Sequence, residues 1–131
     1  KDRFIAAAGM LTTLQQYLKT HHVEQLQPLI AQFLPKGKDS TQVNIGLFID
    51  KEVKSDDEVK FTRMPKGGPL YAIKFNGKFN ERQKAYNSLH QYFTDHLYQS
   101  AIFPFETYLD NKLPGSDTDT VNIQVNFSAY F

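Results

Sequence analysis

A glutamate among aromatic residues is the strongest candidate for chemistry in this sequence. Glu106 lies in the segment 101–109, whose other side chains are almost all apolar or aromatic. A carboxylate in such surroundings must find a partner, take up a proton or wait for a cationic ligand. On the floor of an aromatic pocket it would attract a cation together with ring faces such as that of Tyr108. The alternative is an edge-strand glutamate that lies in water or pairs with Lys74.

The histidines do not form a metal-binding pattern. No carboxylates accompany them in the HExxH spacing. Two of them are expected near the ends of helices, where a partial positive charge complements the helix dipole. The four are His21, His22, His90 and His96.

Two further motifs and the absence of cysteine narrow the chemistry. The acidic run 56–58 is typical of a solvated loop rather than a calcium site. Gly67 and Gly68 precede a strand instead of opening a helix, so they do not form a phosphate loop. Without cysteine, the chain has no disulfide, thiolate metal site or cysteine nucleophile. We therefore expect no metal ion and no cofactor.

Length and charge exclude several classes of protein. The 131 residues predict a single domain, 1–131. The formal charge of +1, from 15 Lys and Arg against 14 Asp and Glu, is too small to attract nucleic acid. No apolar run approaches the roughly 18 residues of a membrane-spanning helix. We expect a cytoplasmic protein with neither nucleic-acid nor membrane partners.

The sequence repeats itself at offsets of 75, 76 and 78 positions. LQQYL at 14–18 recurs as LHQYF at 89–93, PLIAQFL at 28–34 as PFETYLD at 104–110, and VNI at 43–45 as VNI at 121–123. A drift in offset fits a duplication, because loops change length more readily than helices and strands. We predict two pseudo-repeats, 1–50 and 69–131, joined by 51–68.

Each pseudo-repeat contains a helix followed by two strands. Apolar stripes at helical spacing predict helices at 2–21 and 81–97, the second opened by a capping box from Asn80 to Gln83. Strands are predicted at 29–34, 43–49, 105–109 and 121–127. Another strand, 69–75, precedes the second helix and lacks a counterpart before Lys1. An upstream segment of a longer parent protein is therefore expected to supply it.

Strand alternation predicts where the candidate site lies. The fold class is α+β, with mostly antiparallel sheets, two long helices and a central cleft between sheet faces that the helices leave uncovered. On the strand 105–109, Phe105 and Leu109 are expected to face a helix, whereas Glu106 and Tyr108 face away. The predicted ligand-binding residues are Glu106, Tyr108, Phe48, Ile30 and Tyr71.

Several stretches carry a resemblance to a known family. They are GPLYAIKFNG at 68–77, AYNSL at 85–89, FETYLDN at 105–111, TDTVNI at 118–123 and IGLFIDKEV at 45–53. In order and spacing they resemble the GyrI-like small-molecule-binding family, the effector-binding domain of bacterial multidrug-responsive transcription regulators. The resemblance implies a duplicated module with a cleft for hydrophobic, often cationic or aromatic, compounds and a pocket glutamate at Glu106.

The function expected from the sequence is binding of such a ligand by an effector-sensing or sequestering module. Two alternatives stay open. One is hydrolysis of a reactive small molecule, with Glu106 as general base and Tyr108 as donor. The other is an inhibitory module that binds a protein through an exposed apolar patch. No catalytic residue is predicted, because binding is favoured over enzyme activity.

Overall fold

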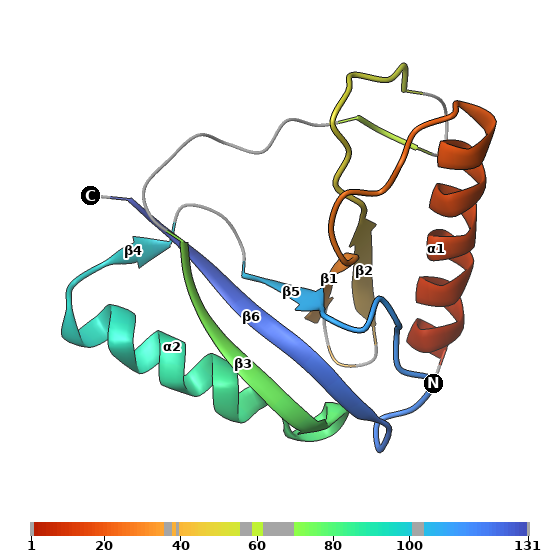
Figure 1. The fold of residues 1–131 in the computed structure, drawn as a ribbon. Helices are drawn as coiled ribbons and strands as arrows, with labels where there is room; N and C mark the ends of the chain where they lie inside the picture. The colour runs from red at the N-terminus through yellow and green to blue at the C-terminus, as the bar shows by residue number, and fades with distance from the viewer. Residues whose placement is uncertain are drawn as a thin grey trace.

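One antiparallel sheet and two helices make up the part of the chain that the computed structural model describes, residues 2–35, 38, 40–55, 59–61, 70–100 and 104–130 (Figure 1). The predicted α+β class is confirmed. The elements are α1 (Asp2–Thr20), β1 (Ile30–Pro35), β2 (Thr41–Gly46), β3 (Leu70–Lys78), the 3₁₀ helix η1 (Phe79–Glu81), α2 (Gln83–Asp95), β4 (Gln99–Ser100), β5 (Phe105–Tyr108) and β6 (Thr120–Tyr130).

The strands of both predicted repeats belong to the same sheet. Its order is β2-β1-β5-β6-β3, and β4 pairs with the end of β6. Strands β1 and β5 join through the antiparallel pairs Ile30 with Thr107 and Ala31 with Glu106, which we call the seam. The expectation of separate sheets facing each other is therefore wrong. The duplication, and a cleft between the repeats, stay predictions.

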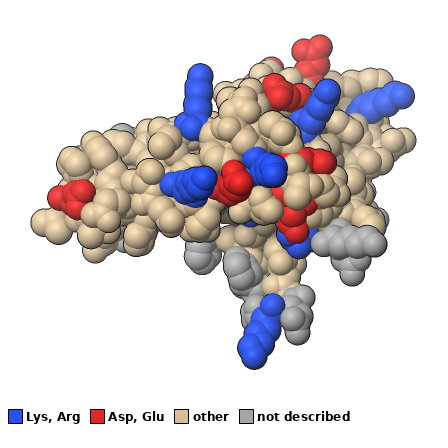
Figure 2. All heavy atoms as spheres, turned by 90° about the horizontal axis from the view of Figure 1, so that it is seen from below, with Lys and Arg blue, Asp and Glu red and all other residues tan. Residues whose placement is uncertain are grey.

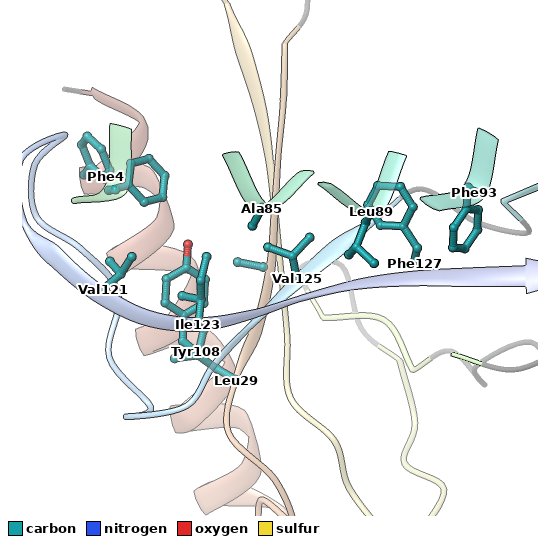
Figure 3. Packing of buried hydrophobic residues seen from close by; sticks show 12 residues of the cluster. Phe4, Leu29, Ala85, Leu89, Phe93, Tyr108, Val121, Ile123, Val125 and Phe127 are labelled. Atoms are coloured by element: carbon teal, nitrogen blue, oxygen red, sulfur yellow. The ribbon is translucent and has the colours of Figure 1, made fainter. Parts of the chain in front are cut away.

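Both helices pack on one face of the sheet. Residues opposite each other on antiparallel strands share a face, so Ala31, Glu106 and Val125 do. The core on this face takes Phe4 from α1 and Ala85 from α2 (Figure 3). Its buried members are Phe4, Leu29, Ala31, Phe79, Ala85, Leu89, Phe93, Tyr108, Val121, Ile123, Val125 and Phe127.

Some boundaries differ from the sequence prediction because tertiary pairing decides them. Strand β3 continues beyond its predicted end at 75 to Lys78, since β6 supplies a partner as far as Thr120. Helix α2 begins at Gln83, and the expected capping box is absent: Asn80 lies in η1, and Arg82 occupies the N-cap position without a side-chain cap. Strand β2 ends at 46 rather than 49.

Several predicted features lie outside the described residues. They include the acidic run at 56–58, the glycine pair at 67–68 and most of the connection 51–68. Within the described ranges, no helix is both long and apolar enough to cross a membrane.

The two helices end in the same way. After α1, His22 has φ 54°, and the N–H of Val23 donates to the carbonyl of Leu18 at 2.9 Å. A left-handed residue followed by a hydrogen bond that spans five positions is the Schellman motif. It recurs 75 positions later, where Leu97 has φ 58° and Tyr98 donates to Phe93 at 2.9 Å.

Candidate functional site

Glu106 is buried in the sheet and fully engaged by hydrogen bonds. It has 1% of its surface exposed. Its Oε1 accepts from the hydroxyl of Tyr108 at 2.5 Å. Its Oε2 accepts from the hydroxyl of Tyr86 at 2.5 Å and from Nε of Arg82 at 2.8 Å. The carboxylate thus has a cationic partner and two hydroxyl donors.

The local geometry of two elements brings these groups together. Arg82 and Tyr86 are four positions apart at the start of α2, so both side chains leave the same side of the helix. Glu106 and Tyr108 are two positions apart on β5 and point to the same face of the sheet. Because α2 packs on that face, the four side chains converge.

The predicted direction of Glu106 and Tyr108 is wrong. In the register of β5 and β6, Glu106 lies opposite Val125 and Tyr108 opposite Ile123, so both point toward the helices. Figure 3 shows the Tyr108 hydroxyl on the side of β6 where Ala85 lies. The prediction assumed that the apolar residues of β5 mark its helix-facing side. Phe105 is buried as well, on the opposite face, so hydrophobicity does not identify the side.

Arg82 lies between Glu106 and an aromatic wall. Its guanidinium carbon is 3.7 Å from the ring centroid of Phe79 and 5.8 Å from that of Phe33. The rings of Phe4 and Phe33 each contact the ring of Phe79, and the distance between ring centroids is 5.3 Å in both pairs. Since these rings come from α1, β1 and η1, the wall is built from both halves of the chain. A planar cation stacked on a ring and paired with a carboxylate combines two favourable electrostatic contacts.

The tyrosines beside Glu106 remain protonated donors. Burial, reinforced by the negative charge of Glu106, raises the pKa of Tyr86 and of Tyr108 well above the ordinary value.

Arg82 and Tyr86 were not among the site residues predicted from the sequence. An arginine and a tyrosine four positions apart near the start of a helix lie on the same side of it, which could have indicated a shared partner. Many solvent-exposed helices have the same spacing, so the pattern is not specific.

Ile30 and Phe48 lie elsewhere. They line a cavity of about 260 Å³ together with side chains of α1, among them Leu14, Tyr17 and Leu18. The lining is largely apolar and does not include Glu106. The structure therefore brings Ile30 and Phe48 together with each other but not with the carboxylate.

Tyr71 belongs to a third place, an aromatic cluster beside the end of α2. Its ring centroid lies 5.3 Å from that of Tyr98, and 5.5 Å from those of Tyr92 and Phe93. A hydrogen bond with the Tyr98 side chain, helped by desolvation, raises the pKa of Tyr71 to about 12. The five predicted residues are thus distributed over three sites.

The helix-free face of the sheet carries an amide network. Asn44 donates to the side-chain oxygen of Gln32 at 3.1 Å, and Asn126 donates to the hydroxyl of Thr107 at 3.0 Å. Gln124 in turn donates to Asn126 at 2.9 Å. These residues point away from the helices, as strand alternation in β6 predicts.

The histidines at the helix ends contact their own helices. His21 stacks on Tyr17 with a centroid distance of 4.0 Å, and His96 stacks on Tyr92 at 3.9 Å. In each pair the Nδ1 atom lies within hydrogen-bonding distance of the tyrosine carbonyl. Among the residues that the structure describes, no group of three His, Asp or Glu side chains is placed to hold a metal ion.

Comparisons with known proteins leave the site to be interpreted from its geometry. No family model matches the chain, and no curated protein matches it.

Proposed function

We propose that this chain binds a small hydrophobic cation at Glu106, as a sensing or sequestering module. The observation that carries the proposal is the buried carboxylate with two tyrosine donors beside an aromatic wall. Carboxylate and ring faces attract a planar cation together. The hydroxyls of Tyr86 and Tyr108 would hold the carboxylate in one orientation while the cation varies.

The position of Glu106 also supports a ligand site shared by both halves. Glu106 pairs across the seam with Ala31, and the aromatic wall includes Phe4 and Phe33 from the first half. A ligand at this position would contact both predicted repeats. We further propose, on the sequence resemblance alone, that the chain belongs to the GyrI-like family.

Local contacts rather than long-range steering must supply the affinity. The chain carries a formal charge of +1, and Figure 2 shows acidic and basic side chains interspersed on the face it displays. A carboxylate in a dry site attracts a cation far more strongly than one in water. We propose binding rather than hydrolysis, because the hydroxyls of Tyr86 and Tyr108 donate to the two oxygens of Glu106 and hold the carboxylate as a fixed charge.

The test compares a planar cation with its neutral analogue. Benzamidinium and benzamide are titrated calorimetrically against the wild type and Glu106→Gln. The substitution should weaken benzamidinium binding by about 1–3 kcal/mol, as expected for a lost charge-assisted contact. It should leave benzamide binding nearly unchanged, since benzamide brings no charge.

Glu81→Gln is the matched control. It removes one negative charge next to Arg82, but Glu81 is exposed and does not contact the site. Benzamidinium binding should survive this change. Equal losses for both compounds in Glu106→Gln, or a wild type without Glu106-dependent cation binding, would contradict the proposed function.

A further inference from the structure

Arg82 already occupies the place that a planar cation would take. Its Nε donates to Glu106, its Nη1 donates to the carbonyl of Phe79 at 3.1 Å, and its guanidinium carbon lies 3.7 Å from the Phe79 ring centroid. These hydrogen bonds and the ring contact are the ones that a bound guanidinium ligand would make. A side chain of the protein itself therefore occupies the proposed cation site.

Arg82 is the more exposed partner of the ion pair. The side chain of Arg82 is 20% exposed, whereas that of Glu106 is 1% exposed. Solvent thus reaches the side chain of Arg82 but not the carboxylate of Glu106. Direct contact with Glu106 requires that the arginine side chain move outward, where water can solvate it.

The carboxylate keeps hydrogen-bond donors when Arg82 moves away. Oε1 accepts from the hydroxyl of Tyr108, and Oε2 accepts from that of Tyr86. Both tyrosines remain beside the ionised Glu106 and hold it in place for another cation.

We propose that Arg82 is an internal competitor that closes the Glu106 site against planar amidinium and guanidinium ligands until one displaces it. The inference rests on the proposed function, because it concerns access to the same carboxylate. The competition lowers the apparent affinity of the ligand. If the site is free of Arg82 for only a small fraction of the time, the apparent dissociation constant is the intrinsic one divided by that fraction.

The experiment supplies the missing part of the arginine as a free molecule. In Arg82→Ala the removed atoms correspond to N-ethylguanidinium, and N-ethylurea is its planar neutral analogue. Calorimetric titration and thermal melting should show that Arg82→Ala binds N-ethylguanidinium roughly tenfold to hundredfold more tightly than the wild type. N-ethylurea should bind both proteins equally.

Two further variants keep the result interpretable. Arg82→Gln retains a long side chain with a hydrogen-bond donor and should also bind the cation more tightly than the wild type, even if Arg82→Ala folds poorly. The double variant Arg82→Ala/Glu106→Gln should lose the gain. Arg3→Ala is the control, because Arg3 also contacts a phenylalanine ring, Phe4, and a carboxylate, Asp117, but at the surface.

Each outcome decides between the two proposals. If removal of Arg82 brings no gain while the wild type binds benzamidinium through Glu106, the competition is refuted and the proposed function stands. If the Arg82 variants alone bind a cation through Glu106, the competition stands and the function proposed for the wild type fails. A gain that persists in the double variant, or that appears equally in Arg3→Ala, overturns the competition.

Discussion

The backbone N–H of Leu29 donates to the side-chain oxygen of Asn111 at 3.0 Å, although the two residues are 82 positions apart. Leu29 is fully buried and directly precedes β1, whereas Asn111 follows β5. The hydrogen bond therefore closes one end of the seam. Beside it, the N–H of Tyr108 donates to the carbonyl of Leu29 at 2.9 Å.

Asn111 contributes through both its side chain and its backbone conformation. Its φ is 57°, a left-handed value that asparagine and glycine tolerate. Asn111→Gly should lower the free energy of unfolding by about 1–2 kcal/mol, because the Leu29 N–H loses its partner. Asn111→Ala should cost about 1 kcal/mol more, because alanine is strained there. Urea denaturation measures both, and a glycine variant as stable as the wild type would show that the hydrogen bond is unimportant.

The ion pair between Arg82 and Glu106 should couple strongly in a double-mutant cycle. Arg82→Met leaves a buried carboxylate without its cation and should cost about 2–4 kcal/mol, somewhat less than for a fully buried pair. The double variant Arg82→Met/Glu106→Gln should cost less than the sum of the single changes, by about 1–2 kcal/mol. Urea denaturation provides the four stabilities, because urea is uncharged and does not screen ion pairs.

An exposed arginine pair offers the matched control for that cycle. Arg3 pairs with Asp117, and their side chains are 30% and 49% exposed. The cycle Arg3→Met with Asp117→Asn should give a coupling below about 1 kcal/mol, as surface ion pairs do. Equal couplings at the two sites would show that burial does not strengthen the pair at Glu106.

Leu97 offers a stabilising substitution. It has φ 58° and is 90% exposed, so its side chain adds strain to the end of α2 without adding buried contacts. Leu97→Gly should raise the free energy of unfolding by about 1 kcal/mol. Leu97→Ala keeps Cβ and should bring no such gain. Thermal or urea denaturation of both variants tests this, and a gain in the alanine variant would mean that lost hydrophobic exposure, not backbone strain, is the cause.

Alkaline pH should destabilise the fold through its tyrosines. A tyrosine in an unfolded chain titrates near pH 10, whereas the pKa of Tyr71 is raised to about 12 and those of Tyr86 and Tyr108 are raised by burial. The folded state then keeps protons that the unfolded state releases. Stability is fully present below about pH 10 and falls as the pH rises toward about 12.

Tyrosinate absorbance against pH measures this titration directly. Tyr98→Phe removes the hydrogen-bond partner of Tyr71 and should move the Tyr71 transition toward pH 10, about its unperturbed value. A Tyr71→Phe variant assigns the transition. If the transition kept its position in Tyr98→Phe, the hydrogen bond would not be its cause.

Periodicity in the sequence predicts most elements of this fold, because helices and strands place apolar residues at different spacings. It also identifies Glu106 as a carboxylate that needs a partner. It does not identify that partner. Lys74 lies opposite Gln124 on the helix-free face, whereas Glu106 points to the helices. The prediction for the face failed at β5, where both sides of the strand are buried and hydrophobicity no longer alternates.

Sequence periodicity does not predict which side chains meet at a turn or at the start of a helix. Arg82 reaches Glu106 because a 3₁₀ turn precedes α2 and orients the first helical residues. No pattern of residue spacing in the sequence predicts that turn. Likewise, Phe48 and Tyr71 lie in different surroundings because β3 and β2 are opposite edges of a single sheet, which the expectation of separate sheets could not anticipate.

The sheet order has a consequence for the order of folding. The partners of Glu106 are 24, 20 and 2 positions away, whereas the seam joins Ile30 to Thr107. Closing a long loop costs more chain entropy than closing a short one. We expect the carboxylate network to assemble within the C-terminal half before β1 docks and adds Phe33 to the aromatic wall. Pulse-labelling hydrogen exchange should then protect amides of β5 and β6 ahead of those of β1, and simultaneous protection would refute this order.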